Sequence, residues 1–273
     1  MFATASGNVR RNALSDFVNV KANGKIAMKL DEGDRIVRVR TCTEDDDIIL
    51  FARDGKCIRF STTDVRVFKG RDSVGVRGMK LAKGDEVIGL SVLAHVDVET
   101  AERTAYLKYA RALRGHADEE EGEDEDDASA APTTISMERA EELAAQEQFV
   151  LSVTENGYGK RTSSYEYRVA GRGGQGIINI ETGARNGKMV GGFPVEDSDE
   201  VMLVTDGGQL IRFPVYDIRI AGRGTAGVRL IRTSADERVV SVSRLRDVTD
   251  GGEEDDDDDG SAGPDAGATD ETQ

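Results

Sequence analysis

The chain has 273 residues, enough to bury a sizeable core, and carries 52 acidic against 36 basic residues, a formal net charge of −16. No apolar run approaches the ~20 residues that a membrane-spanning helix needs, so no membrane partner is expected. The two histidines both lie within 95–148, so no histidine triad or histidine metal cluster is expected in the rest of the chain. The two cysteines, Cys42 and Cys57, are interpreted as reduced thiols of a cytoplasmic protein.

A short phrase recurs four times along the chain: a polar turn closed by glycine, then a strand that ends in a basic residue. The turn glycines are Gly7, Gly55, Gly157 and Gly208, at spacings of 48, 102 and 51 residues. A second marker, a glycine in a basic loop before an apolar strand, recurs at Gly24, Gly75, Gly176 and Gly227, at spacings of 51, 101 and 51 residues. Two markers with one period near 50 residues are typical of propeller blades and other stacked arrays.

Each repeat is predicted to hold four short strands. Residues 1–4 match the second strand of a repeat, so we expect the chain to start within a repeat and to be part of a longer array. The next repeat predicts strands at 35–40, 48–52, 56–60 and 75–81; the run at 48–52 is apolar throughout, as in a strand buried on both faces. This composition predicts an all-β, propeller-like fold of four-stranded blades, with an open array or a sandwich as the alternative.

An insertion and a tail carry the acidic excess. We place the first two repeats at 1–94, the insertion at 95–148, the last two repeats at 149–245 and the tail at 246–273. The insertion and the tail each have a net charge of −11, which leaves 30 basic and 24 acidic residues, a net of +6, in the repeats. Helical spacing is present at 98–113 and 134–148, with Ser136 as an N-cap.

The acidic runs at 118–127 and 253–259 are too highly charged to pack, so we expect them to be solvated and disordered. They are interpreted either as solubilising segments or as mimics of DNA that compete for the basic repeats. The helical insertion is interpreted either as decoration of one blade or as a partner site.

Basic residues recur at two positions of the repeat: the end of the third strand and the loop before the fourth. In a ring of blades equivalent positions share one rim, where bases and glycine N–H groups can bind phosphate without reading sequence. The alternative is an ordinary solvated surface. The predicted DNA-binding residues are Arg10, Arg11, Lys21, Lys25, Arg59, Lys69, Arg71, Arg77, Lys160, Arg161, Arg168, Arg172, Arg212, Arg219, Arg223 and Arg229.

The most specific phrases are Asn156-Gly157-Tyr158-Gly159-Lys160-Arg161-Thr162, Gly75-Val76-Arg77-Gly78 and Gly227-Val228-Arg229-Leu230-Ile231-Arg232. With the repeats around them they resemble the C-terminal domain of the DNA gyrase A subunit, a six-bladed β-pinwheel, over residues 1–245 apart from the insertion. The resemblance implies a domain that binds and wraps duplex DNA and so supports negative supercoiling by an ATP-hydrolysing type IIA topoisomerase. It also implies a bacterial, nucleoid-associated A2B2 complex in which the gyrase B protein supplies ATP and Mg; this segment itself is expected to hold no catalytic residue, metal or cofactor.

Two departures from the family pattern shape these expectations. The family's wrapping motif, Gln-Arg-Arg-Gly-Gly-Lys-Gly, belongs to the first blade, and its nearest match here, Ala170-Gly171-Arg172-Gly173-Gly174-Gln175-Gly176, keeps the glycines but only one arginine. With four of six repeats and no tyrosine in a cleavage-domain context, the chain is expected to be a partial subunit that wraps DNA incompletely. The alternatives are the C-terminal domain of the topoisomerase IV A subunit and a protein-binding propeller whose acidic arms recruit basic partners.

Overall fold

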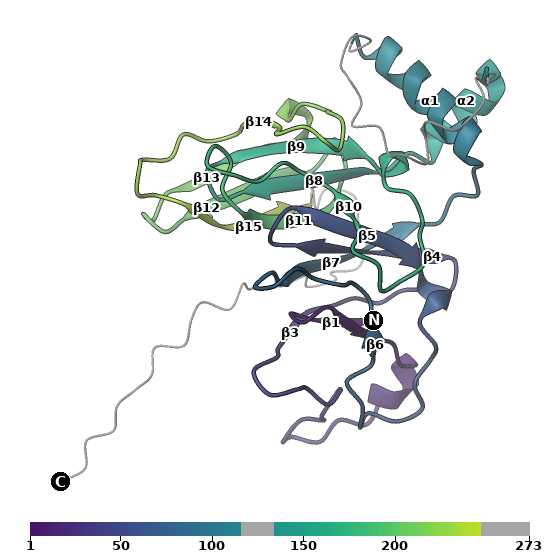
Figure 1. Cartoon of the computed structure of the whole chain (residues 1–273), viewed down its shortest axis with the longest axis vertical. Coiled ribbons are helices and arrows are strands. Elements are labelled where there is room, and N and C mark those ends of the chain that lie inside the picture. The colour runs from purple at the N-terminus through teal and green to yellow at the C-terminus, as the bar shows by residue number, and fades with distance from the viewer. Residues whose placement is uncertain (116–133, 247–273) are drawn as a thin grey trace.

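The computed structural model describes residues 1–115 and 134–246, which form four antiparallel sheets and a helical hairpin (Figure 1). The first sheet has the order β3 (Ile36–Val39), β1 (Phe2–Thr4), β2 (Asn8–Arg10), β6 (Val76–Arg77), and the second β10 (Ile177–Ile178), β5 (Lys56–Ser61), β4 (Asp46–Ala52), β7 (Val87–Ala94). The third has the order β11 (Met189–Val195), β8 (Phe149–Thr154), β9 (Tyr158–Ser163), β14 (Val228–Arg229), and the fourth β13 (Leu210–Pro214), β12 (Glu200–Thr205), β15 (Val239–Leu245). The prediction of an all-β fold of blade-like sheets is confirmed.

Successive sheets exchange strands, which the sequence did not indicate. After β5 the chain passes through the 3-10 turn η2 (Thr62–Asp64) to β6, which pairs with β2 of the preceding sheet, and then returns as β7 beside β4. In the same way, β10 pairs with β5 after the turn η4 (Ser164–Glu166), and β14 pairs with β9 after the turn η5 (Val215–Asp217). The prediction that a repeat forms its own blade is therefore wrong: each central hairpin takes its outer strands from the residues that follow it.

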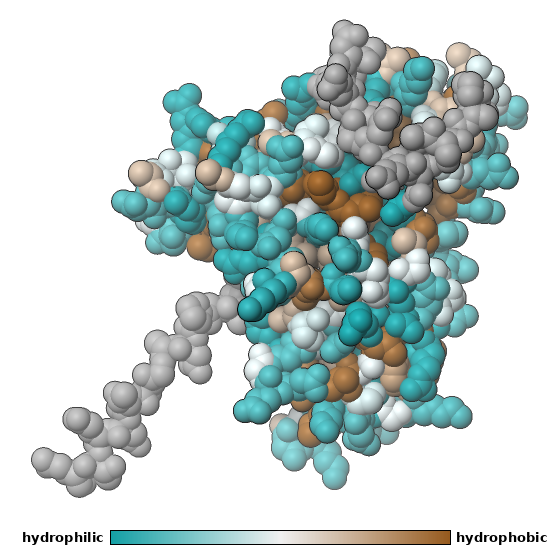
Figure 2. All heavy atoms as spheres, in the orientation of Figure 1, coloured by the Kyte–Doolittle hydropathy of each residue, from teal (hydrophilic) through white to brown (hydrophobic). Residues whose placement is uncertain are grey.

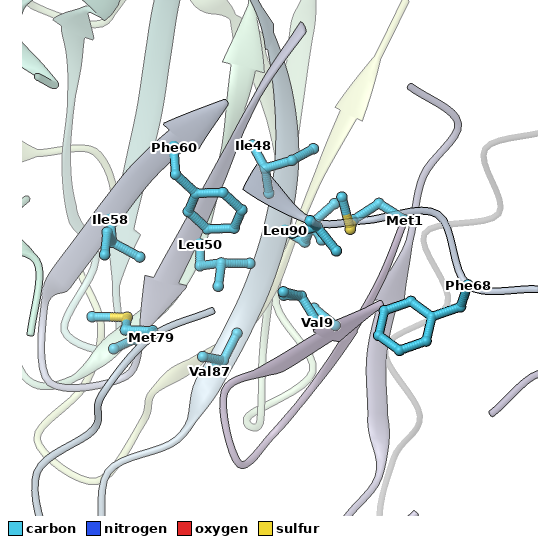
Figure 3. Close-up of a cluster of buried hydrophobic side chains, with 13 residues drawn as sticks. Met1, Val9, Ile48, Leu50, Ile58, Phe60, Phe68, Met79, Val87 and Leu90 are labelled. Atoms are coloured by element: carbon cyan, nitrogen blue, oxygen red, sulfur yellow. The ribbon is translucent and has the colours of Figure 1, made fainter. Parts of the chain in front are cut away.

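The apolar cores lie between neighbouring sheets. Side chains alternate along β4, so Ile48 and Leu50 face the first sheet, where Val9 belongs to the same buried cluster (Figure 3). Ile49 and Phe51 point the other way and pack in the cluster that contains Val150 of the third sheet. The apolar run of β4 is thus buried on both faces, as the sequence predicts, and the second sheet packs against both of its neighbours.

Three of the four turn glycines, Gly7, Gly55 and Gly157, lie against the exchanged loop of the next repeat. Gly55 has φ +87°, and an added Cβ would lie 2.5 Å from the carbonyl oxygen of Ile180. The Gly55 carbonyl accepts hydrogen bonds from the N–H groups of Asn179 (2.8 Å) and Ile180 (3.2 Å). Glycine is needed here because the turn requires positive φ and because another backbone occupies the space of a side chain. At these three junctions the two recurring glycine markers are therefore the two sides of one contact.

The first occurrence of the second marker forms no strand. Residues 24–28 lie outside the assigned strands, after the 3-10 turn η1 (Leu14–Phe17), and Ile26 is 76% exposed. By analogy with β6, residues 24–28 would pair with a strand of a preceding sheet. The described residues contain no sheet before the one that holds β1. The marker predicts a strand at this position, and that prediction is wrong.

The insertion begins after Ala94 of β7 and returns at β8. Helix α1 (Thr100–Leu113) packs against α2 (Met137–Ala145), and the Ser136 hydroxyl accepts a hydrogen bond from the Arg139 N–H at 3.2 Å as a helix N-cap. The predicted helices and this cap are confirmed. The hairpin projects at the upper right of Figure 1. Both predicted acidic runs lie outside the described residues.

Candidate nucleic-acid interface

The arginines that end the third strands hold the next repeat in place. Arg59 Nη1 donates to the carbonyl oxygen of Ser164 at 2.9 Å, and its Nε donates to Asp47 Oδ2 at 2.9 Å. At the equivalent position of β9, Arg161 Nε donates to the carbonyl oxygen of Ile218 at 2.7 Å. We call the equivalent residues Arg11, Arg59 and Arg161 the latch arginines, and Arg11 makes the matching bond to the Val65 carbonyl.

Lys160, one residue before a latch arginine, is also directed inward. Its Nζ donates to the carbonyl oxygens of Gly222 (2.7 Å) and Thr225 (2.9 Å) in the loop of the next repeat. These carbonyls favour the ammonium form, but burial outweighs them and lowers the pKa of Lys160 to about 7. Arg10 has the equivalent position in β2, where its Nη1 donates to the carbonyl oxygen of Ser73 at 2.6 Å.

The arginines in the loops before β6, β10 and β14, here called the loop arginines, each bond to the corresponding segment of the preceding repeat. Arg172 Nη1 donates to the carbonyl oxygen of Arg77 at 3.0 Å, and Arg71 Nη1 makes the equivalent bond to Ile26 at 2.6 Å. Arg223 repeats the contact with the carbonyl of Ile178. Much of the recurring basic pattern therefore reflects a recurring need to satisfy loop carbonyls between repeats.

The sixteen predicted residues consequently divide by burial. Five are buried and contact protein groups, so they do not present their side chains to a duplex: Arg10, Arg59, Lys160, Arg161 and Arg223. Four are half-buried: Arg11, Lys25, Arg71 and Arg168. Seven are exposed: Lys21, Lys69, Arg77, Arg172, Arg212, Arg219 and Arg229. The sequence pattern predicts that every recurring base faces solvent. It does not show that loops of the next repeat bring carbonyl groups against some of these side chains.

The exchanged strands present two of the exposed bases at one structural position. Arg77 in β6 and Arg229 in β14 are each the second residue after a marker glycine, and each pairs with the first residue of a neighbouring third strand. Arg229 Nη2 also donates to the Tyr158 hydroxyl at 2.7 Å. The visible face of the molecule is mainly hydrophilic, with apolar residues in small groups (Figure 2).

Arg185 is a candidate that the sequence pattern missed. Its guanidinium lies 4.7 Å from the centre of the Tyr158 ring, and the Arg229 guanidinium lies 5.3 Å from it. Hydrogen bonds from Arg229 and Arg185 lower the pKa of the Tyr158 hydroxyl. Arg185 lies in the Gly183–Gly187 loop, outside both recurring basic positions, so only the tertiary structure brings this exposed base beside Arg229.

The described residues contain no candidate metal site. Within 1–115 and 134–246, no group of three histidine, cysteine, aspartate or glutamate side chains could hold a metal ion. The buried carboxylate of Asp47 is committed to Arg59 and to His95, whose Nδ1 lies 3.0 Å from Asp47 Oδ1. None of the helices in this part of the chain is long and apolar enough to cross a membrane.

Comparison with known proteins places these features in a family. The family model described as the DNA gyrase C-terminal domain, a β-propeller, matches residues 1–43, 46–94, 148–196 and 199–246. The DNA gyrase A subunit of Granulibacter bethesdensis is 52% identical over 284 residues, covering 99% of this chain and 30% of that protein. Its counterpart in Rickettsia typhi is 44% identical, over 93% of this chain and 28% of that protein, and the one in Escherichia coli is 35% identical, over 91% and 22%. The chain thus spans less than a third of these relatives.

Two solved structures share the fold. The gyrase A C-terminal domain aligns with a TM-score of 0.63 at 22% identity, covering 89% of this chain and 64% of that one. The C-terminal domain of DNA topoisomerase IV aligns with a TM-score of 0.66 at 19% identity, covering 90% and 61%. At these identities the two structures support the fold alone and do not separate the gyrase prediction from the topoisomerase IV alternative; the family model and the curated relatives favour gyrase.

Proposed function

The chain belongs to the family of DNA gyrase C-terminal domains, and we propose that it is the duplex-DNA-binding module of a gyrase A subunit. The observation that carries the proposal is the repeated exposure of bases on the exchange loops and strands. Arg77 and Arg229 occupy one structural position on two sheets, and Lys69, Arg172 and Arg219 are exposed in the loops that lead to the exchanged strands.

These residues suit the phosphate backbone better than base edges. Arginine and lysine neutralise phosphates without reading sequence, and binding of this kind weakens steeply with salt. The latch arginines and the loop arginines hold the loops to their neighbours, so the exposed bases are presented from a preorganised framework. A repeated array of such positions is suited to a duplex that follows the curved series of sheets.

The finer proposal is that the module wraps DNA for the whole enzyme. In it the chain contributes no catalytic residue, metal or cofactor, and it acts within a bacterial cytoplasmic, nucleoid-associated A2B2 complex whose gyrase B protein hydrolyses ATP with Mg. DNA wrapped by the module would be presented for strand passage, which supports negative supercoiling. The four sheets, and the single arginine at 170–176, predict a shorter wrap than a six-bladed domain gives.

The test measures the binding of a linear duplex of about 30 bp by fluorescence anisotropy, at salt concentrations from roughly 50 to 200 mM. Arg77→Gln with Arg229→Gln should weaken binding and lower the slope of log K against log[salt] by roughly one for each phosphate that is no longer neutralised. The control, Lys83→Gln with Lys108→Gln, removes the same charge from exposed positions outside the predicted set and should leave the slope unchanged.

Two results would overturn the proposal: wild-type binding that does not respond to salt, or equal slopes for the two double variants. Binding that appears only with basic protein partners would instead favour a protein-binding propeller.

A further inference from the structure

Two exposed arginines converge on one tyrosine at the edge of the third sheet. The guanidinium groups of Arg185 and Arg229 lie 4.7 Å and 5.3 Å from the centre of the Tyr158 ring. Arg229 Nη2 donates to the Tyr158 hydroxyl at 2.7 Å, and hydrogen bonds from Arg229 and Arg185 lower the pKa of that hydroxyl. N–H groups of both side chains therefore gather around a single oxygen atom, which places the two cations beside each other.

The strand that carries Arg229 is held by the turn before β9. Arg229 pairs with Tyr158 in the register between β14 and β9, which lie side by side in Figure 1. The Gly157 carbonyl accepts hydrogen bonds from the N–H groups of Leu230 (2.8 Å) and Ile231 (3.2 Å), the two residues that follow Arg229. The position of this arginine is therefore set by the backbone on both sides of its pairing partner.

The loop that carries Arg185 is fastened to the same turn. Asn156 Nδ2, in the turn before β9, donates to the carbonyl oxygen of Arg185 at 2.9 Å. Asn186, which is buried, donates from its Nδ2 to the carbonyl oxygen of Ala226 at 2.7 Å, in the loop before β14. Both arginines are thus presented from one preorganised framework, which lowers the entropic cost of binding a ligand.

A longer segment in the third repeat forms this loop. The segment from the marker glycine to the returning strand spans 75–87 in the second repeat, 176–189 in the third and 227–239 in the fourth. The third segment is one residue longer than the other two, and a β-bridge joins Gly183 to Gly187 within it. Arg185 lies at the middle of the bridged loop, so the longer segment brings a base to a place where the other repeats have none.

The tyrosine is also specific to the third sheet. At the equivalent positions of the first two sheets, the exchanged strands pair Arg77 with Asn8 and Ile178 with Lys56. Neither pair offers an aromatic ring against which a guanidinium group can lie. The convergence of two arginines is therefore a feature of one repeat and is not part of the recurring basic pattern.

Neither Arg185 nor Arg229 has a carboxylate partner among the residues that the structure describes. Their side chains are exposed, and their contacts are those with Tyr158. Glu155, which precedes the turn, is paired with Arg53 at 2.9 Å. Adjacent cations without a counter-charge attract an anion, and guanidinium groups match phosphate in geometry as well as in charge, because their N–H groups can donate in pairs to two oxygens.

We propose that Arg185 and Arg229 form a clamp that binds a single backbone phosphate of duplex DNA. The clamp rests on the proposed function, and it adds a DNA-binding residue and a shared ligand for two bases. Because both cations meet the same phosphate, either arginine still neutralises that phosphate when the other is removed. Two independent contacts would not compensate for each other in this way.

The test measures binding of a linear duplex by fluorescence anisotropy as a function of salt, with Arg185→Gln, Arg229→Gln and the double variant beside the wild type. Each single variant should weaken binding about three- to tenfold and keep the wild-type slope of log K against log[salt], because the phosphate stays neutralised. The double variant should lower that slope by roughly one.

Two controls separate the clamp from general effects of charge. Arg185→Lys with Arg229→Lys keeps both charges and loses the paired donors, so it should weaken binding and leave the slope as in the wild type. Lys83→Gln removes one charge from an exposed position outside the clamp and should change neither affinity nor slope. Unfolding temperatures verify that every variant is folded.

The clamp is overturned if the folded double variant keeps the wild-type slope, or if it lowers the slope by about two, as two independent phosphate contacts would. A decrease of about one in either single variant also overturns it. The proposed function fails separately, when the wild type itself shows no salt-dependent binding of the duplex. Salt-dependent binding by the wild type together with an unaffected double variant removes the clamp alone.

Discussion

Arg59 donates a hydrogen bond to the carbonyl oxygen of Ser164, a residue 105 positions further along the chain. The insertion lies between them in sequence, yet Arg59 still bonds to backbone carbonyls of the next repeat, as Arg161 does to the carbonyl of Ile218, 57 positions away. A basic residue thus joins the two repeats even where a long insertion separates them in sequence. The repeating unit of the fold is the junction between two repeats, and a basic residue is part of each junction.

Removing a latch arginine should destabilise the fold strongly. Arg59→Ala leaves the Asp47 carboxylate, which is fully buried, without its cation, and breaking a buried pair in this way costs about 3–5 kcal/mol. Arg212→Ala is the matched control because Arg212 has the same position in the fourth repeat but is exposed and paired only with Glu200. Urea unfolding should show a large decrease in stability for Arg59→Ala and little change for Arg212→Ala. Equal decreases would mean that the latch contact contributes no more than a surface pair.

The turn glycines allow a second matched comparison. Gly55 and Gly208 have nearly the same φ, +87° and +81°, but an added Cβ meets the Ile180 carbonyl at Gly55 and nothing within 4 Å at Gly208. Gly208→Ala should cost about 1–2 kcal/mol from backbone strain alone. Gly55→Ala should cost about 1–3 kcal/mol more, because overpacking at the junction is added. The measurement is the free energy of unfolding in urea, and identical values would exclude a packing role for the turn at Gly55.

The sequence predicts the features of the fold that depend on local pattern. The continuous apolar run of β4, the Asp54-Gly55 turn and the N-cap at Ser136 are short-range signals, and the structure agrees with each of them. The exchange could not be predicted this way, because Ile177 pairs with Cys57 at a distance of 120 residues and nothing in either strand specifies the other. A strand of two residues at an edge carries too little pattern to identify its partner.

One feature of the sequence could have predicted that a basic residue is buried. Asp47 directly precedes the apolar residues 48–52 of β4, and a carboxylate buried beside such a run needs a cation. Arg59 lies on the paired strand β5, twelve residues later, so the pair could have been identified. The remaining contacts could not, because their acceptors are loop carbonyls, which any residue supplies. Whether the exposed bases bind DNA stays a prediction.

Thiol labelling should report the packing between the second and third sheets. Cys57 is fully buried in the cluster that contains Val150 and Met189, whereas Cys42 is half-buried. In native buffer a thiol reagent should modify Cys42 readily and Cys57 only at the rate at which the structure opens. Mass spectrometry of the labelled peptides distinguishes the two sites, and Cys42→Ser gives the rate at Cys57 alone. Rapid modification of both thiols in the folded chain would contradict the packing described.

Lys160 should make stability depend on pH in an unusual direction. Burial lowers the pKa of its ammonium from 10.5 to about 7, so between these values the unfolded chain binds one proton more than the folded chain at this site. Stability therefore rises with pH in this window, by about 1.4 kcal/mol for each pH unit, and is independent of this group well below pH 7. Lys160→Met removes the titrating group. The free energy of unfolding of the wild type, relative to Lys160→Met, should increase by about 2–3 kcal/mol between pH 7 and 9.

The control for this experiment is Lys188→Met. Lys188 is exposed, and its ion pair with Asp54 raises the pKa of its ammonium above the ordinary value, so it stays protonated in both states between pH 7 and 9. The difference in unfolding free energy between wild type and Lys188→Met should accordingly be flat across that range. A flat difference for Lys160→Met as well would show that the carbonyls of the neighbouring loop hold Lys160 in its charged form despite burial. In that case the contact would behave like those of the latch arginines, as a permanent cation between repeats.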